Sequence, residues 1–179
     1  MDKTLKQFID ISIRYLILIL IALPNLYIFY LVFTPLTIYS VYFLLNLFFD
    51  CTITSNVITV SSVPIEIIKA CVAGSAYYLL LIFNLSIPKT KFKKRIKMIF
   101  ISFASLLLLN ILRIFFLSIL LISDSIWFDF THKLFWYLLS IVFVVGIWFA
   151  EVKAFKIKEI PFYSDILFLY KKSSLKRIL

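Results

Sequence analysis

Three side chains suited to covalent chemistry lie in apolar segments of this sequence: Cys71, Arg113 and His132. Each occupies a different segment, namely IEIIKACVAGSAYYLLL, LLLLNILRIFFL and FDFTHKLFWYLL. A thiol can act as a nucleophile, an imidazole can carry a proton in both directions, and a guanidinium can stabilise developing negative charge. Together these groups would support acyl transfer, provided that the elements that carry them meet in space.

The composition predicts that these elements lie in a lipid bilayer. Of the 179 residues, 63% are hydrophobic and 18% are aromatic, whereas soluble domains are roughly 45–50% apolar. A soluble domain of this length would leave much apolar surface exposed to water, so a bilayer is the expected solvent. With only 2 Gly and 5 Pro, the chain has little linker sequence. We expect one transmembrane catalytic domain over 1–150, followed by a basic cytoplasmic tail over 151–179.

The net charge of +10 is typical of nucleic-acid-binding proteins, but the positions of the charges argue against that class. One basic cluster separates two apolar stretches, and a second lies in the C-terminal tail. Basic clusters that flank apolar spans are typical of cytoplasmic loops in contact with anionic lipid. No nucleic-acid-binding module accompanies them, so we expect the membrane as a partner and no nucleic acid. The clusters comprise Lys89, Lys91, Lys93, Lys94, Arg95 and Lys97, and Lys153, Lys156, Lys158, Lys171, Lys172, Lys176 and Arg177.

The scarcity of metal-binding side chains predicts no metal and no other cofactor. The chain has 1 His and only 2 Cys, and their spacing matches no metal motif. Cys51 is assigned a structural role, with a disulfide to Cys71 as the alternative in an oxidising exterior. The apolar N-terminal run has no small-residue cleavage site behind it, so it is interpreted as a retained signal anchor.

The apolar stretches predict an all-α polytopic membrane protein. A hydrocarbon core of about 30 Å takes about 20 helical residues, and Pro24 predicts a kink in the first span. The shorter stretch 35–49 begins with Pro35 and is expected to form an interfacial or re-entrant helix on the outer side. The alternation in TITSNVITV, residues 52–60, predicts a short extracellular β-hairpin. The four expected spans are 13–33, 67–86, 97–120 and 131–150.

With the loop 89–97 in the cytoplasm, the three reactive side chains reach a common depth. Cys71 lies about four residues, or roughly 6 Å, from the outer end of its span. Arg113 lies 16 residues beyond Lys97, or roughly 24 Å up a core of about 30 Å. His132 opens the last span at the outer face. The sequence therefore predicts a multi-pass protein of the cell membrane with both termini in the cytoplasm and its active site at the extracytoplasmic face.

Residues that share a helix face with these groups are predicted to bind substrate. At about 100° per residue, Ser75 and Tyr78 lie on the same side as Cys71, and Asn110 lies one turn below Arg113. Polar side chains in a membrane helix are expected to face a partner or a water-filled cavity. The small residues 73–76 would let another helix or a substrate approach closely. Asp124 and Asp129 precede His132, and either is a candidate to orient its imidazole.

The pattern resembles the archaeosortase/exosortase family of membrane transpeptidases. The resemblance rests on ACVAG around Cys71, NILR at Arg113 and THKLFW at His132. A preceding apolar span, a Pro-led helix and a β-like stretch ending just before the Cys extend it over roughly 35–150. It implies that Cys71 is the nucleophile and that Arg113 and His132 complete the catalytic site.

The resemblance also implies the substrate. It would be an exported surface protein with a C-terminal signal made of a short motif, a transmembrane helix and a basic end. The enzyme would cut near the motif, hold the upstream part as a thioester on Cys71 and pass it to an amine, expected on a lipid. Water as the acceptor would make the enzyme a protease. Two other classes stay open: a non-enzymatic small subunit of a membrane transporter or assembly complex, and a membrane thioesterase or acyltransferase.

Overall fold

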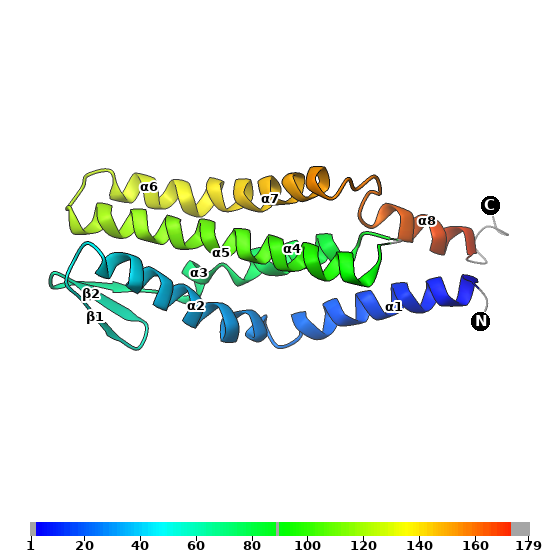
Figure 1. Ribbon diagram of the computed structural model, residues 1–179, viewed down its shortest axis with the longest axis horizontal. Coiled ribbons are helices and arrows are strands. Elements are labelled where there is room, and N and C mark those ends of the chain that lie inside the picture. The colour runs from blue at the N-terminus through cyan, green and yellow to red at the C-terminus, as the bar shows by residue number, and fades with distance from the viewer. Residues whose placement is uncertain (1–2, 89, 173–179) are drawn as a thin grey trace.

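The computed structural model describes residues 3–88 and 90–172 and shows an elongated helical bundle with a small β-sheet at one end (Figure 1). The first and last helices, α1 and α8, lie at the opposite end. Lys89 and residues 173–179 of the predicted basic clusters lie outside the described residues. The elements are α1 (Lys3–Ala22), α2 (Tyr27–Asn46), β1 (Cys51–Thr54), β2 (Val57–Val60), β3 (Val63–Glu66), α3 (Lys69–Val72), α4 (Gly74–Leu85), α5 (Phe92–Ile122), α6 (Phe128–Leu134), the π-helical turn η1 (Phe135–Leu139), α7 (Ser140–Ala154) and α8 (Tyr163–Lys172).

Two of the described helices, α2 and α5, are long and apolar enough to cross a membrane. A third span results if Phe128–Leu138 and Ser140–Ala154, which meet at an angle of 47°, are counted as one. The expected span 97–120 falls within α5, and the expected span 131–150 falls within this bent pair. The expected span 67–86 corresponds to the shorter apolar stretch Lys69–Leu85. The helical character is thus confirmed, and the number of four spans stays a prediction.

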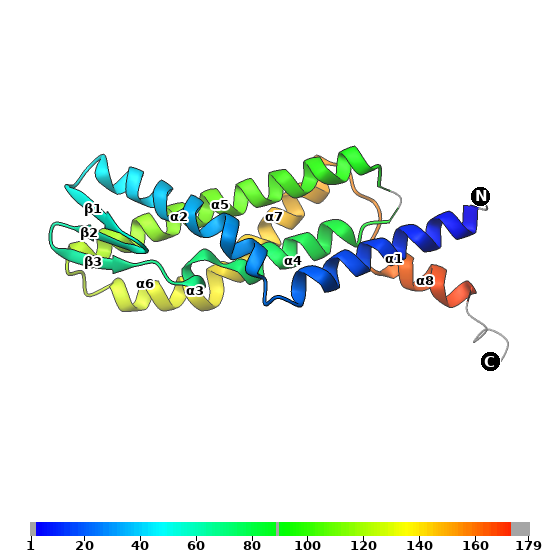
Figure 2. The same ribbon diagram turned by 90° about the horizontal axis from the view of Figure 1, so that it is seen from below.

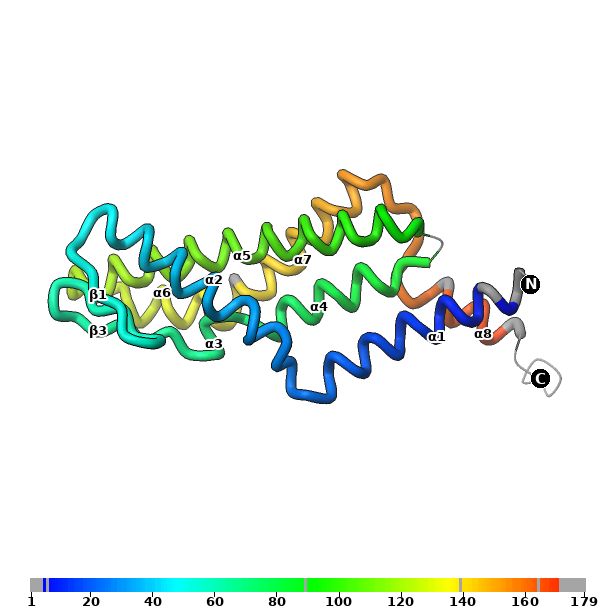
Figure 3. The backbone as a smooth tube through the Cα atoms, turned by 60° about the horizontal axis from the view of Figure 1, so that its bottom comes forward, coloured from blue at the N-terminus to red at the C-terminus, as the bar shows by residue number. Residues whose placement is uncertain are grey.

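The predicted kink at Pro24 is a complete break between two helices. Helix α1 ends at Ala22 and α2 begins at Tyr27, and Asn25 and Leu26 between them have positive φ angles of 50° and 59°. Figure 3 shows the two helices meeting at an angle. The kinked helix expected over 13–33 is therefore two separate helices, because the chain changes direction after Pro24, which lacks a backbone N–H.

The prediction of a separate outer helix over 35–49 is wrong, because Pro35 lies inside α2. Helix α2 continues through this proline since the face carrying Phe33, Ile38 and Val41 is buried in the core. Proline weakens a helix interior by removing one hydrogen bond, and this apolar burial offsets the loss.

The predicted hairpin is confirmed as β1 and β2, and a third strand extends it into an antiparallel sheet of order β1-β2-β3. Ser55 turns the chain between β1 and β2 with a φ of 58°, and Ser61 and Ser62 turn it between β2 and β3 with φ of 47° and 75°. Two central residues with positive φ are typical of a two-residue hairpin loop. Strand β3 contains Pro64, which fits an edge strand because proline cannot donate to a ladder.

Helix α5 is the central element of the bundle and packs against α2, α4, α6 and α7. An aromatic cluster joins three of these helices. The rings of Phe33 on α2 and Tyr77 on α4 are stacked, with their centroids 3.7 Å apart. The ring of Phe103 on α5 meets Tyr77 edge-on, with a centroid separation of 5.5 Å. Such ring pairs contribute about 0.5–1.5 kcal/mol beyond the apolar area that they bury.

Gly74, at the start of α4, allows α2 to approach closely. A Cβ atom at this position would lie 2.7 Å from Cζ of Tyr30 on α2. The expectation that the small residues 73–76 permit a close approach is confirmed, and here the approaching group is a tyrosine ring of a neighbouring helix.

A buried polar contact joins α5 to the C-terminal parts of α4 and α7. Asn84 Nδ2 donates hydrogen bonds to Glu151 Oε2 at 3.1 Å and to Ser102 Oγ at 3.3 Å. Both Asn84 and Glu151 are buried. Because hydrogen-bonded polar groups inside an apolar bundle fix one helix against another, this contact sets the packing of α7.

A buried ion pair fixes α8 against α1. Arg14 donates to both carboxylate oxygens of Asp165, at 2.9 and 3.0 Å, and to the backbone carbonyl of Leu85 at 2.8 Å. Tyr15 adds a hydrogen bond to Asp165 at 3.4 Å. The boundary expected at residue 150 lies inside α7, and part of the expected surface tail is buried against the bundle.

Replacing Asp165 with Asn leaves the charge of Arg14 without its buried partner. We expect a loss of about 3–5 kcal/mol in the free energy of unfolding, the usual cost of breaking a buried ion pair. The side chains of Arg14 and Asp165 are only 4% and 2% exposed, so neither reaches water without local unfolding. Equilibrium unfolding of the full chain in mixed micelles measures this loss.

Asp10→Asn is the matched control, because Asp10 is the other carboxylate partner of Arg14 and its side chain is 54% exposed. We expect this variant to lose less than about 1 kcal/mol, as exposed pairs do. If both variants lose the same free energy of unfolding, the buried pair of Arg14 and Asp165 is not the main contact that holds α8 against α1.

Candidate active site

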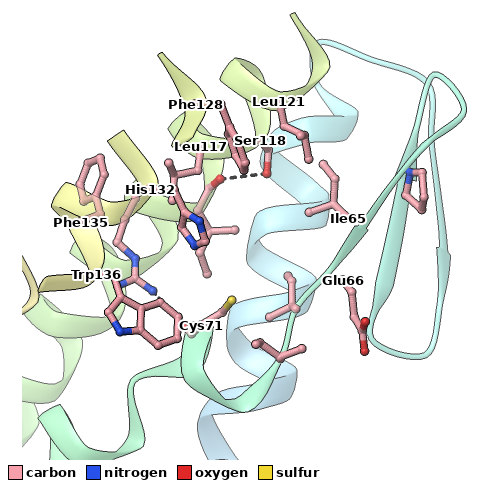
Figure 4. Close-up of a pocket in the computed structure, with 15 residues that line it drawn as sticks. Ile65, Glu66, Cys71, Leu117, Ser118, Leu121, Phe128, His132, Phe135 and Trp136 are labelled. Carbon is pink, nitrogen blue, oxygen red and sulfur yellow. Dashed lines mark hydrogen bonds between the residues drawn. The ribbon is translucent and has the colours of Figure 1, made fainter. Parts of the chain in front are cut away.

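The three residues singled out by their chemistry line one cavity. The cavity has a volume of about 270 Å³ and lies between β3 with α3 on one side, α5 at its base, and α6 with η1 on the other side. Figure 4 shows the Cys71 sulfur and the His132 ring turned into this space. Its lining residues are Pro64, Ile65, Glu66, Ile67, Ile68, Cys71, Arg113, Ile114, Leu117, Ser118, Leu121, Phe128, His132, Phe135 and Trp136.

Cys71 lies in a single helical turn that is separated from α4 by a break in the backbone. Helix α3 ends at Val72, and Ala73 adopts a left-handed conformation with φ 60° and ψ 44°. In a continuous helix, the Cys71 carbonyl would accept a bond from the N–H four residues later. The break removes that bond, so the Cys71 carbonyl needs another donor.

Two side chains of α5 satisfy this carbonyl. Asn110 Nδ2 donates to the Cys71 oxygen at 2.8 Å, and Arg113 Nη2 donates to the same oxygen at 3.2 Å. Arg113 Nη1 also donates to Ser140 Oγ at 3.2 Å, and the Ser140 hydroxyl donates to the Phe135 carbonyl at 2.9 Å. The guanidinium therefore ties the thiol-bearing turn to α5 and to the start of α7.

These contacts make Asn110 and Arg113 positioning residues in the structure. Asn110 does not line the cavity, and its amide holds the Cys71 backbone. Arg113 lines the cavity, but both of its terminal nitrogens have partners. Its Nε is buried without a hydrogen-bond partner among the described residues. The guanidinium thus places a positive charge next to the turn that carries the thiol.

His132 lies between two aromatic rings on one face of α6 and η1. Its ring stacks on that of Phe128, with the centroids 5.6 Å apart, and meets that of Trp136 edge-on, with the centroids 6.0 Å apart. No hydrogen bond joins it to Asp124 or Asp129, which line a neighbouring hollow of about 200 Å³. Neither Asp124 nor Asp129 therefore orients the His132 imidazole in this structure. The direction of the ring is set by its packing against Phe128 and Trp136.

Ser75 and Tyr78, predicted to bind substrate, do not line the cavity. Ser75 is exposed, and the Tyr78 hydroxyl donates to the Leu18 carbonyl of α1 at 3.1 Å. The physical reason is the break at Ala73, because the advance of about 100° per residue does not continue from Cys71 into α4. Tyr78 instead fixes α4 against α1.

Cys51 lies in β1, opposite Val60 of β2, and does not line the cavity. Both Cys51 and Cys71 are free thiols, so the alternative of a disulfide between them is not present. Burial, and to a smaller extent the neighbouring Asp50, raise the pKa of the Cys51 thiol above its ordinary value. Cys51 is thus a reference thiol outside the cavity against which reactivity at Cys71 can be measured.

Among the described residues, no group of three or more His, Cys, Asp and Glu side chains is arranged to hold a metal ion. No protein-family model, no curated protein and no solved structure matches this chain. Its function must therefore be inferred from the geometry of the site and from the sequence.

Removing the amide of Asn110 tests its role in holding the turn of Cys71. In Asn110→Ala, the Cys71 carbonyl loses its shorter hydrogen bond in a buried setting, and we expect a loss of about 1–3 kcal/mol in the free energy of unfolding. Ser118→Ala is the matched control on the same helix, because its hydroxyl bonds only to the carbonyl of Ile114 in its own helix. Unfolding in mixed micelles should show less than about 0.5 kcal/mol for this control, and equal losses would argue against the positioning role.

The pKa of Cys51 predicts how its alkylation depends on pH. The thiolate is the reactive form, so a raised pKa keeps the reaction with iodoacetamide slow at pH 8. The rate should still be rising as the pH passes 9, the ordinary pKa of this group, and should level off only at higher pH. Asp50→Asn removes one contribution to the shift and should increase the rate at pH 8. Both measurements use the Cys71→Ala background, and a rate that levels off below pH 9 would contradict the shift.

Proposed function

We propose that this chain is a membrane-embedded cysteine transpeptidase that cleaves the C-terminal sorting signal of exported surface proteins. The observation that carries the proposal is that Cys71, Arg113 and His132, from three separate elements, line one cavity. A nucleophile, a proton carrier and a fixed cation are the groups that acyl transfer requires. The resemblance of ACVAG, NILR and THKLFW to the archaeosortase/exosortase family points to the same chemistry.

The reaction begins with the transfer of the Cys71 thiol proton to His132. The thiolate attacks the scissile carbonyl carbon, and the positive charge of Arg113 stabilises the oxyanion. His132 then gives its proton to the leaving amine as the C–N bond breaks, which leaves the upstream chain as a thioester on Cys71. In the second half, His132 takes a proton from the acceptor amine, which forms the new amide and releases the thiolate.

The arrangement of the elements supports an extracytoplasmic location for this site. The basic start of α5 lies at the end of the molecule where α1 and α8 lie, and α6 and the sheet lie at the other end (Figure 1). Basic residues favour the cytoplasmic side of a membrane. With the basic end in the cytoplasm, the cavity between β3 and α6 opens toward the exterior, and both termini are cytoplasmic.

The partners follow from the resemblance and from this orientation. The substrates are exported proteins with a C-terminal motif, transmembrane helix and basic tail, and such a helix would place the motif at the level of the cavity. The acceptor is an amine, on a lipid of the outer leaflet, and water as the acceptor would give a peptidase.

A non-enzymatic membrane subunit of a transporter or assembly complex is the second candidate. It is favoured by the contacts of Arg113, whose terminal nitrogens hold the Cys71 carbonyl and Ser140 in a purely structural arrangement. This candidate predicts that replacing the Cys71 sulfur has no effect on any covalent intermediate, because none forms.

Trapping the thioester separates the two candidates. The Cys51→Ala chain, isolated from its native membranes and denatured in acid without reductant, should carry a peptide on Cys71 that hydroxylamine releases. The matched Cys71→Ala chain, which keeps Cys51, should carry none. Mass spectrometry of the attached peptide would identify the sorting motif. The proposal fails when Cys71 carries no such peptide and surface proteins keep the same C-termini in the wild type and in Cys71→Ala.

A further inference from the structure

Strand β3 is an edge strand whose unpaired side borders the cavity. In the sheet order β1-β2-β3, only β2 pairs with β3. Five consecutive residues, 64–68, line the cavity, together with Cys71 on the turn that follows. Figure 2 shows β3 as the strand on the side of α6, and the cavity lies between these two elements.

The backbone hydrogen bonds between β2 and β3 fix which groups of β3 face this edge. Ile67 N–H donates to the carbonyl of Asn56 at 2.9 Å, so its backbone faces β2. Backbone groups alternate in direction along a strand of an antiparallel pair. The backbone of Ile65 therefore also faces β2, and the backbone groups of Pro64 and Glu66 face the free edge.

The free edge thus offers the Glu66 N–H and carbonyl and the Pro64 carbonyl. Pro64 has no N–H, so a paired segment gains hydrogen bonds at Glu66 and at one carbonyl beyond it, and the added strand is short. Edge groups of this kind are a template for another extended chain. Glu66 lies five residues before Cys71, so a segment paired there runs toward the thiol.

We propose that the substrate binds as an extended peptide that adds to β3 as a short fourth strand. Its backbone exchanges hydrogen bonds with Glu66, and it places a large apolar side chain in the cavity in front of Cys71. This inference rests on the proposed function and names how the same site recognises its substrate. The walls formed by Leu117, Phe135 and Trp136 suit an apolar side chain.

The size and polarity of the cavity favour a peptide segment over a lipid chain. A volume of about 270 Å³ lies near the lower end of the roughly 300–1,000 Å³ of ligand pockets, which suits one or two side chains. An acyl chain would fill the apolar part but leave the N–H and carbonyl groups of β3 without partners. Pro64 and Glu66 are exposed, so a peptide backbone can reach these groups and form hydrogen bonds with them, which an acyl chain cannot do.

The experiment compares two probes of Cys71 with the same electrophile. One is the tetrapeptide acetyl-Thr-Val-Thr-Phe joined to an acyloxymethyl ketone, and the other is the same ketone with only a methyl cap. The ratio of their labelling rates on the full chain in detergent measures recognition of the peptide, independently of the reactivity of the thiol. We expect the peptide probe to label the wild-type chain faster.

Glu66→Pro removes the N–H of the free edge and leaves the backbone hydrogen bonds to β2 in place. It also removes the side-chain hydrogen bond that Asn56 Nδ2 donates to Glu66 Oε1. We expect the rate ratio to fall about fivefold to tenfold, as for the loss of one backbone hydrogen bond. Ile53→Pro is the matched control on the opposite edge. Ser61 N–H donates to the Asp50 carbonyl, so alternation places the N–H of Ile53 on the outer side of β1, away from the cavity. Its ratio should stay at the wild-type value.

Methylation of the probe gives a second measurement on the unaltered chain. Backbone amides of a paired strand point alternately toward and away from the neighbouring strand. N-methylation of each probe amide in turn should therefore lower the ratio with a period of two residues. A variant that does not fold leaves this measurement unaffected.

The outcomes separate this inference from the proposed function. If neither probe labels Cys71, the proposed function fails and the strand addition fails with it. If both probes label Cys71 at equal rates, or if the ratio is the same in Glu66→Pro and shows no two-residue period, strand addition alone is overturned. A palmitoyl-linked ketone that labels faster than the peptide probe would assign the cavity to an acyl chain and also overturn the inference.

Discussion

The cavity depends on one broken stretch of backbone and on the two side chains that satisfy it. At Ala73 the chain leaves the helix, and the Cys71 carbonyl loses its helical partner. An unsatisfied carbonyl in an apolar bundle costs several kcal/mol. Asn110 and Arg113 supply the missing hydrogen bonds from α5. The same contacts that make the break tolerable therefore also hold the thiol at a fixed place against the central helix.

Helix α5 has two structural roles, one in each half of its length. One half packs α2 and α4 through the aromatic cluster around Tyr77, and the other half forms the base of the cavity. The π-helical turn η1 follows His132, and π-turns are frequent at functional sites. At the end of this turn, Ser140 joins the chain of hydrogen bonds from Arg113. Helix α5 thus sets the position of the thiol and, through Ser140, holds the end of the turn that follows the imidazole.

The sequence predicted the meeting of Cys71, Arg113 and His132 because depth in a membrane follows from helix rise and from the positions of basic residues. It did not predict the residues around them. Ser75 and Tyr78 were assigned by assuming that one continuous helix runs from Cys71 to Tyr78, and the break at Ala73 interrupts that helix. The sequence gives no signal for this break, because a positive φ is expected at Gly74 and occurs instead at the alanine before it. The ion pair of Arg14 and Asp165 was not predicted, because its two residues are 151 positions apart in the sequence. The hairpin of β1 and β2 was predicted from the local alternation of its residues. Strand β3 was not predicted as part of the sheet, because it contains Pro64, and proline is compatible with a strand only at the edge of a sheet.

The ion pair of Arg14 and Asp165 has a consequence for the order of events during synthesis. Arg14 emerges from the ribosome before Asp165, which follows 151 residues later. Until then Asp10, on the same helix, is its carboxylate partner, and α1 lacks the contact that fixes it to α8. A chain that stops before Asp165 cannot close this buried pair, so the pair is a chemical mark of synthesis through α8.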